Sequence, residues 1–210
     1  MLRSAGRNGL LLTLFAIATT GLIALTHQLT KERIADAKRA QQYASLTRLL
    51  PAGSYDNDLA ASCVQLAADP RLGPGDHQAF IARKEQLTSA IALQVTAPDG
   101  YSGSIELLVA IDRDGVLTGV EVLGHKETPG LGDKIERRRS SWLDSFVGRR
   151  LERDPDPRFA VKKDGGDFDQ FTGATITPRA VVGAVANALR YHAEQAPLLA
   201  NRQPDCGDQP

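Results

Sequence analysis

The chain has 210 residues, and 25 Lys and Arg residues balance 25 Asp and Glu residues. This length suggests one domain with attachments, and the balanced charge excludes a strongly basic surface for binding nucleic acid. The two cysteines, Cys63 and Cys206, form neither a CxxC pair nor a Cys/His cluster, so we expect no metal site. They could form one disulfide in an oxidising compartment. Because Cys206 lies in a polar tail that contains proline, we do not predict that bridge.

The first apolar segment predicts a single membrane-spanning helix. Residues 9–26 carry no charge and are rich in Leu, Ala and Ile. This segment has about the minimum length for a membrane-spanning helix. A cleaved signal peptide is the alternative, but residues 25–28 offer no good cleavage site and helix-compatible sequence continues beyond them. We therefore predict an N-terminal tail at residues 1–8 and an uncleaved transmembrane anchor at residues 9–28.

The charges that flank this anchor leave its orientation open. Arg3 and Arg7 precede it, whereas four basic residues follow it: Lys31, Arg33, Lys38 and Arg39. Counting Lys and Arg near the ends would, if anything, keep the C-terminal side in the cytoplasm.

Residues 29–50 predict a helical stalk that ends at the Pro51-Ala52-Gly53 sequence. Its apolar residues become denser toward its end, at Leu46, Leu49 and Leu50. This pattern is typical of a stalk that docks on a domain only at its far end. We interpret residues 55–75, which include an apolar patch at residues 59–68, as irregular structure.

The middle of the chain predicts an antiparallel meander, and therefore an α+β fold rather than a βαβ array. The predicted strands are residues 78–84, 87–97, 104–112 and 117–123. In the third of them Ile105, Leu107, Val109 and Ile111 alternate on one face. Turn sequences at residues 98–100 and 112–115 connect the last three strands.

The segment after the meander is expected to form a loop at residues 125–132, a helix and a last strand. The helix carries Ile135, Trp142, Leu143 and Phe146 inward, and the strand covers residues 158–163. His125 and Glu127 suggest a metal or acid–base site, but no third ligand is evident and geometry must support such a role. We interpret this pair as structural. The consecutive Arg137, Arg138 and Arg139 are interpreted as a solvated face.

The loop at residues 169–178 leads into the last predicted helix, residues 178–194, with Thr177 as the N-cap and Pro178 at the first helical position. Thr172 to Thr175 then lie near the positive end of the helix dipole, which suits a phosphate. From spacing alone, a capped loop without a ligand is the better interpretation. Residues 195–210 are expected to be a disordered tail.

Two strings in the chain resemble a known family. Residues 164–182, DGGDFDQFTGATITPRAVV, resemble the FMN-attachment region of the G subunit of the Rnf ion-translocating electron transport complex. Residues 125–132, HKETPGLG, resemble the second signature of that family. The order of anchor, strands and later motifs also agrees, so the resemblance covers residues 10–192.

The resemblance implies that residues 51–194 form an antiparallel-sheet FMN-binding domain with flanking helices. FMN would be attached by a phosphoester bond to the hydroxyl of Thr175. A flavin transferase that uses FAD as donor would install it, recognising Asp169, Thr172, Gly173, Ala174 and Thr175. Further expected cofactor contacts are Glu127, Thr128, Leu131, Thr172, Gly173, Ala174 and Thr177.

The resemblance also implies a function and a location. The subunit would relay electrons through FMN between redox centres of neighbouring membrane subunits, with no independent catalytic site of its own. The anchor would cross the bacterial inner membrane once, with residues 1–8 in the cytoplasm and the FMN domain in the periplasm. The alternatives are a subunit of the related sodium-translocating NADH:quinone reductase, a flavin-domain regulator, and a non-redox anchored module that binds a free phosphate or a partner peptide.

Overall fold

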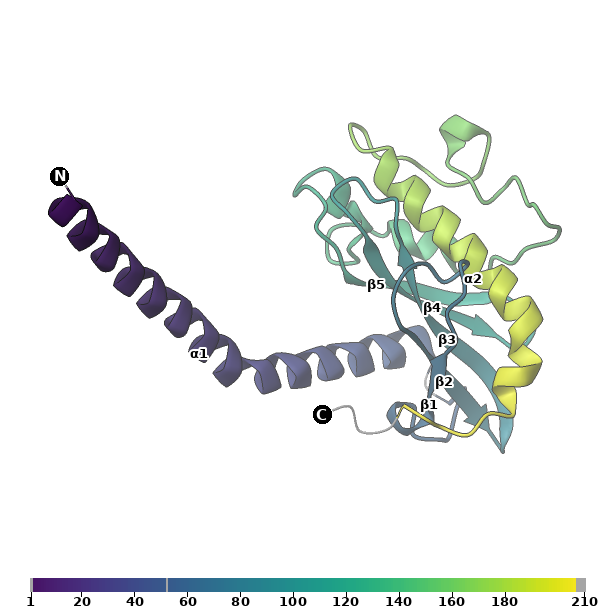
Figure 1. The fold of residues 1–210 in the computed structure, drawn as a ribbon. Helices are drawn as coiled ribbons and strands as arrows, with labels where there is room; N and C mark the ends of the chain where they lie inside the picture. Colours follow the sequence, from purple (N-terminus) through teal and green to yellow (C-terminus); the bar gives the residue numbers. More distant parts are fainter. Residues whose placement is uncertain (1, 52, 207–210) are drawn as a thin grey trace. The chain divides into compact units, whose positions relative to one another are not determined.

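The computed structural model describes residues 2–51 and 53–206, and the chain divides into two compact units, Met1–Gln41 and Gln42–Pro210. Helix α1 (Leu2–Leu49) forms the first unit and continues into the second (Figure 1). Its segment Gly6–Ile34 contains an 18-residue window with a mean hydropathy of 2.0, and it is long and apolar enough to cross a membrane. Threonine hydroxyls in this segment donate to carbonyls one turn earlier, as Thr13 does to Gly9 over 2.9 Å, so they need no water as a partner.

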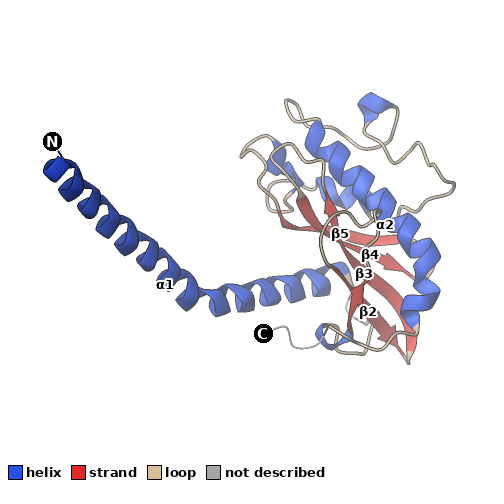
Figure 2. Cartoon of the chain, in the orientation of Figure 1, coloured by secondary structure: helices blue, strands red, loops and turns tan. Residues whose placement is uncertain are grey.

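The second unit is built on a five-stranded antiparallel sheet whose strands pair in chain order (Figure 2). The strands are β1 (Cys63–Leu66), β2 (His77–Lys84), β3 (Leu87–Ala97), β4 (Ile105–Asp112) and β5 (Leu117–Gly124). The predicted meander is confirmed. The expectation of irregular structure at residues 55–75 was wrong for β1, because a four-residue strand is too short to show alternation and forms by pairing Cys63 with Phe80 of β2.

Alternating side chains of the strands supply two separate hydrophobic cores, one on each face of the sheet. On the first face Ile105, Leu107, Val109 and Ile111 pack under helix α2 (Ile176–Ala200), which crosses the sheet as Figure 1 shows. The second face is built largely of alanines, among them Ala82, Ala90, Ala92 and Ala110. It packs against Leu46 and Leu49 in the last turn of α1 and against Leu50, which follows the helix. The predicted docking of the end of the stalk is thus confirmed.

The C-terminal segment is ordered further than the sequence suggested. Helix α2 continues to Ala200 instead of ending near Glu194, and it includes Pro197. Leu199 is buried against the sheet, and Arg83 of β2 donates to the carbonyl oxygens of Ala200 and Arg202 over 3.2 and 3.3 Å. These contacts with the sheet explain why residues 195–206 do not form the expected disordered tail, while residues 207–210 lie outside the described part.

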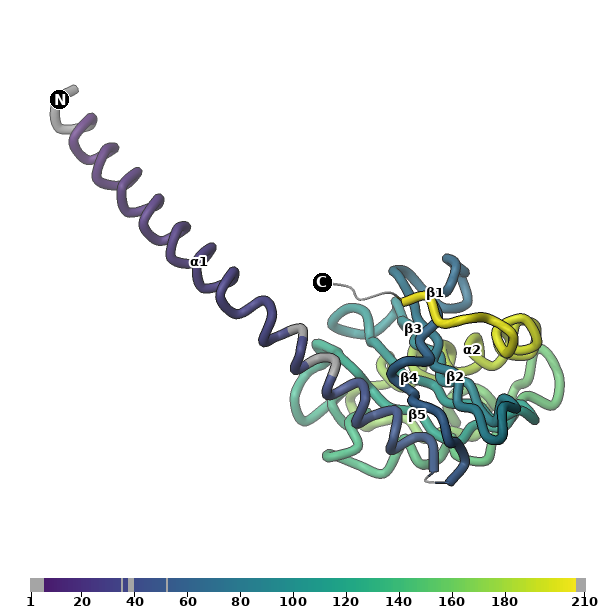
Figure 3. The backbone as a smooth tube through the Cα atoms, turned by 90° about the horizontal axis from the view of Figure 1, so that it is seen from below, coloured from purple at the N-terminus to yellow at the C-terminus, as the bar shows by residue number. Residues whose placement is uncertain are grey.

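Cys63 and Cys206 form a disulfide, contrary to the prediction from the sequence. The segment that ends at Cys206 lies beside the edge strand β1 (Figure 3). There the amide of Gln65 donates to Asp205 Oδ1 over 2.6 Å and the amide of Asp205 donates to the Cys63 carbonyl over 3.1 Å. Pairing of the tail with an open sheet edge brings the two sulfurs together, which the composition of the tail did not reveal.

The connection between β5 and α2 contains no regular helix or strand, which corrects two further predictions. The expected helix is replaced by two short 3₁₀ helices, Gly132–Ile135 and Trp142–Phe146, which still bury Ile135, Trp142, Leu143 and Phe146. The amide of Trp142 donates to the hydroxyl of Ser140, a local bond that competes with a continuous helix. The expected strand at residues 158–163 is reduced to a single bridge between Val161 and Phe168.

Candidate functional site

An aromatic cluster positions the loop that precedes α2. Trp142 packs edge-on against Phe171, with ring centroids 5.2 Å apart, and Phe146 stacks on Phe168 at 4.4 Å. The indole Nε1 of Trp142 donates to the carbonyl oxygen of Asp169 over 2.8 Å. The buried rings of Phe168 and Phe171 thus fix both ends of the segment 168–171, and the residues that follow form a tight turn at the surface.

The turn after Phe171 exposes its tip. The amide of Ala174 donates to the Phe171 carbonyl over 3.1 Å, and Gly173 adopts φ +80°, a backbone conformation that favours glycine. Thr172 and Gly173 are exposed, whereas Ala174 and Thr175 are half-buried. The loop therefore projects two small or polar residues into solvent immediately before the helix.

The residue at the N-cap of α2 differs from the predicted one. Thr175 occupies the N-cap position, but its side chain makes no capping hydrogen bond. Thr177 is not the cap: it lies inside the helix, fully buried, and its hydroxyl donates to Glu127 Oε2. The prediction was wrong because the buried Glu127 carboxylate, supplied by a distant loop, takes this hydroxyl. Among the described residues, no hydrogen bond uses the hydroxyl of Thr175.

Glu127 connects its own loop with the β3–β4 turn and the first turn of α2. Its Oε2 accepts from Thr177, and its Oε1 accepts from the backbone amide of Ser102 in the β3–β4 turn over 3.0 Å. Its own amide donates to Nδ1 of His125 over 3.0 Å, so the other ring nitrogen of His125 carries the proton and donates to Glu136 over 2.9 Å. The structural interpretation of His125 and Glu127 agrees with these contacts.

The charged residues next to Glu136 are paired rather than simply solvated. A hydrogen bond from Arg138 is the main cause that lowers the pKa of Glu136 to about 2. Arg137 pairs with Glu121 over 3.1 Å and Arg139 with Asp133 over 3.4 Å. Of the three arginines interpreted as a solvated face, Arg138 and Arg139 are exposed and Arg137 is half-buried, and each is paired with a carboxylate.

These loops enclose a cavity of about 260 Å³ in front of the N-terminus of α2. Seven sequence-predicted residues line it: Glu127, Thr128, Leu131, Gly173, Ala174, Thr175 and Thr177. Gly132 belongs to the same wall, and a Cβ there would lie 2.8 Å from Glu127 Oε2 and 2.9 Å from Thr177 Oγ1. The close packing of backbone and carboxylate gives the cavity its shape.

Two predicted residues lie outside the cavity and three residues were missed. Thr172 is at the exposed tip of the loop, and exposed Asp169 pairs with Lys162 over 2.6 Å. The missed lining residues are Tyr101, Gly132 and Ile176. Gly132 and Ile176 are sequence neighbours of predicted contacts, whereas Tyr101 comes from the distant β3–β4 turn, where the amide of Ser102 is bonded to Glu127.

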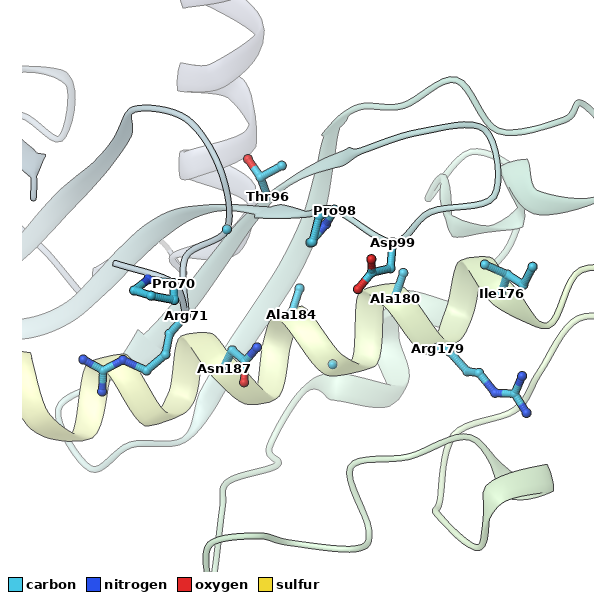
Figure 4. A pocket seen from close by; sticks show the side chains of 12 residues that line it. Pro70, Arg71, Thr96, Pro98, Asp99, Ile176, Arg179, Ala180, Ala184 and Asn187 are labelled. Atoms are coloured by element: carbon cyan, nitrogen blue, oxygen red, sulfur yellow. The ribbon is translucent and has the colours of Figure 1, made fainter. Parts of the chain in front are cut away.

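A larger cavity of about 500 Å³ lies on the other side of Ile176, along α2 (Figure 4). Ala180 and Ala184 of α2 line it, and Figure 4 shows Ala184 pointing toward Pro98 and Ala180 lying beside Asp99. The two arginines at its rim are already paired: Arg71 with Asp69 and Glu194, and Arg179 with Asp164. We consider the smaller cavity the candidate functional site, because Thr175 lines it.

The smaller cavity combines groups that suit an organic phosphate. Thr175 offers a hydroxyl beside the N-terminus of a 25-residue helix, where an anion is stabilised by the helix dipole. Another part of the lining is apolar, with Tyr101, Leu131 and Ile176. In the part of the chain that the structure describes, no group of three or more His, Cys, Asp or Glu residues is placed to hold a metal ion.

Comparison with known families matches both parts of the chain. Residues 1–49 match the RnfG N-terminal region, and residues 100–190 match the FMN-binding domain. The match at residues 100–190 includes every residue that lines the cavity, and it includes the two sequence strings at residues 125–132 and 164–182. A phosphate-bearing flavin fits the lining, which combines an unbonded hydroxyl at a helix N-terminus with an apolar wall.

Full-length relatives share one description, the G subunit of an ion-translocating oxidoreductase complex. The relative from Escherichia coli (strain K12) is 50% identical over 208 residues, which cover 99% of this chain and 100% of that protein. The relative from Yersinia pestis is 50% identical over 209 residues, covering 99% of each chain. The one from Pseudomonas aeruginosa (strain UCBPP-PA14) is 53% identical over 190 residues, covering 90% of this chain and 89% of that protein.

Proposed function

Because the chain belongs to the family of G subunits of ion-translocating oxidoreductase complexes, we propose that it relays electrons between neighbouring redox subunits through FMN attached to Thr175. The observation that carries the proposal is the position of the Thr175 hydroxyl and its lack of a hydrogen-bond partner in the described part of the chain. It lines the cavity of the FMN-binding domain and takes part in no hydrogen bond among the described residues. Thr177, two residues later, is committed to Glu127.

The surface position of the loop supports modification by a separate enzyme. Asp169, Thr172 and Gly173 are exposed, so a flavin transferase can reach the acidic residue and the tip of the turn. In this reaction the Thr175 oxygen forms a bond to the phosphorus of the FMN half of FAD, the pyrophosphate bond breaks and AMP leaves. The hydroxyl proton goes to a base of the transferase, since a threonine hydroxyl is a poor nucleophile without help.

The chain's own residues then hold the cofactor. The N-terminus of α2 stabilises the single charge of the phosphodiester, and the bonds of Glu127 to Ser102 and Thr177 keep the cavity walls together. Bound flavin supplies the ability to take up two electrons and to release them one at a time. The electron donors and acceptors would be centres on the other subunits of an Rnf-type complex in the membrane.

We place the FMN-binding domain on the periplasmic side of the bacterial inner membrane, anchored by the helix at Gly6–Ile34. The disulfide between Cys63 and Cys206 supports this orientation, because disulfides persist in oxidising compartments such as the periplasm and are rare in the cytosol. The flanking charges did not provide this information.

The proposal is tested by producing the full chain with its flavin transferase and separating it in a denaturing gel. We expect a band with flavin fluorescence, and a peptide containing Thr175 heavier by one phosphodiester-linked FMN. Thr175→Val keeps the shape of the side chain and removes the hydroxyl, so it should lose both signals. Thr175→Ser, the matched control, keeps a hydroxyl and should retain them.

Two results would contradict the proposal. A wild-type chain without FMN after co-production with an active transferase would exclude covalent attachment. A fluorescent band that persists in Thr175→Val would place the bond on another residue. Copurification of the wild-type chain with other membrane redox subunits tests the relay separately from the attachment.

A further inference from the structure

Three exposed apolar side chains of the second unit gather around the cavity that Thr175 lines. Tyr101 is 67% exposed, Ile176 46% and Leu131 43%, and all three belong to the cavity lining. Single exposed apolar residues are normal on a protein surface, but a group around one concave site marks a place where an apolar ligand or partner binds.

The backbone of Tyr101 is held in place although its side chain is exposed. A Cβ on the preceding Gly100 would lie 2.2 Å from the carbonyl oxygen of Gly103, so the β3–β4 turn is tight. The following amide, that of Ser102, donates to Glu127 Oε1 over 3.0 Å. The turn is therefore fixed to the cavity wall, and the tyrosine ring has only its own two side-chain torsions left to adjust.

The size of the cavity limits what it can enclose. Its volume of about 260 Å³ is below the range of about 300–1,000 Å³ that is usual for small-molecule sites. A whole FMN would therefore extend beyond it. The phosphate must remain beside Thr175 and the N-terminus of α2, so the apolar wall is left for the flat ring of the flavin.

We propose that Tyr101 is a positioning residue whose ring packs against the isoalloxazine ring of the FMN on Thr175, with Leu131 and Ile176 completing the apolar wall. This inference rests on the proposed function and adds to it the residue that orients the electron carrier. An aromatic ring suits a flat conjugated ligand because stacked or edge-to-face contacts add to the burial of apolar area. The incomplete enclosure leaves part of the flavin accessible to a redox partner.

The alternative cavity along α2 is a weaker place for the ring. It is larger, but no aromatic residue lines it, and the arginines at its rim are held by carboxylates. The wall next to Tyr101 is the one that combines an aromatic ring with exposed aliphatic side chains.

The test uses the full-length holoprotein and reads the flavin rather than electron-transfer activity. Tyrosine in contact with an excited flavin quenches its fluorescence because the phenol donates an electron. Fluorescence per FMN is measured in the native state and again after denaturation of the same sample, which removes differences in loading. Iodide quenching reports how accessible the ring is. The variants are Tyr101→Ala, Tyr101→Phe and the matched control Tyr43→Ala, which removes an exposed tyrosine of α1.

We expect Tyr101→Ala to raise native fluorescence per FMN several-fold and to increase quenching by iodide. Tyr101→Phe should raise the fluorescence, since phenylalanine is a poor electron donor, and should keep the protection from iodide. Tyr43→Ala should match the wild type in both measurements.

The proposal is overturned if Tyr101→Ala carries FMN on Thr175 and matches the wild type in fluorescence and in iodide quenching. If Tyr101→Ala takes up no FMN, Tyr101→Phe decides: unchanged native fluorescence in that variant overturns the contact, and a gain supports it. Failure of the proposed function is separate, because it appears as absence of FMN from the Thr175 peptide of the wild type.

Discussion

The hydroxyl of Thr177 donates a hydrogen bond to the buried carboxylate of Glu127, and so joins the first turn of α2 to the loop that follows β5. The two residues are 50 positions apart in the chain. Glu127 also accepts from the amide of Ser102 in the β3–β4 turn, so one carboxylate holds three walls of the cavity. The geometry of the proposed flavin site therefore depends on a group that need not take part in electron transfer.

Removing the Thr177 hydroxyl should destabilise the domain. Thr177→Val leaves a buried carboxylate without one of its donors, at a cost of about 1–3 kcal/mol in the free energy of unfolding. Urea denaturation of the full chain in detergent measures this cost. Thr172→Val is the matched control, because Thr172 is exposed and should change stability by less than about 0.5 kcal/mol. Equal effects of the two substitutions would show that the bond contributes nothing to stability.

Replacing Gly132 and Gly183 by alanine should change the unfolding free energy in opposite directions. In Gly132→Ala the new Cβ meets Glu127 Oε2 at 2.8 Å and Thr177 Oγ1 at 2.9 Å, so the unfolding free energy should fall by about 1–3 kcal/mol. Gly183→Ala, inside α2, has no atom within 4 Å of the new Cβ and should gain up to about 1 kcal/mol from helix propensity. The same denaturation measurement decides both. A neutral Gly132→Ala would mean that the cavity wall adjusts without cost.

The disulfide should contribute substantially to stability. Cys63 and Cys206 are 143 residues apart, and cross-links that close long loops stabilise a domain by about 2–5 kcal/mol. We expect the double substitution Cys63→Ser and Cys206→Ser to lower the midpoint of thermal unfolding. A reductant should lower the wild-type midpoint to that of the double variant and should leave the double variant unchanged. A wild-type midpoint insensitive to reductant would contradict the prediction.

Stability should decrease as the pH falls toward 4 because of His192. Burial is the main cause that lowers the pKa of His192 to about 4 from the ordinary value of 6.5, and nearby Asp112 acts weakly in the opposite direction. The folded state favours the neutral ring of His192, so the stabilising contribution of this ring is complete above pH 6.5. It is lost as the pH falls from 6.5 to the folded pKa of about 4. The loss by pH 5 is about 2 kcal/mol.

Replacing this histidine isolates its contribution. Denaturation at pH 7.5 and pH 5 should show a smaller decrease in unfolding free energy for His192→Gln than for the wild type. Burial also lowers the pKa of His77, which remains in both proteins and provides the common background. Equal decreases in the two proteins would exclude His192 as the source of the pH dependence.

Local patterns in the sequence were sufficient for much of the fold. Alternation from Ile105 to Ile111 identified β4 and its core face, and the Asp112–Gly115 turn identified the hairpin to β5, because both signals lie within one or two adjacent strands. The sequence also predicted the last helix at residues 178–194, and the buried face of α2 contains Val182, Val185 and Leu189. Leu46, Leu49 and Leu50 likewise marked the docking end of α1.

Interactions between distant segments decided the rest. The strand β1 exists because it pairs with β2, and the last turns of α2 and the disulfide are held by the sheet edge. Thr177 was assigned as a cap because the sequence shows only its neighbours, whereas the structure supplies Glu127 as its partner.

The sequence by itself determined that Thr175 lies in a small-residue loop before a helix, since composition and spacing over ten residues define such a loop. Only the tertiary structure decided that the hydroxyl of Thr175 is unbonded, that Glu127 holds the cavity walls, and that Tyr101 faces the same space. The physical reason is that hydrogen bonding and burial depend on which groups meet in space. For this site those groups come from three loops separated by more than 20 residues each.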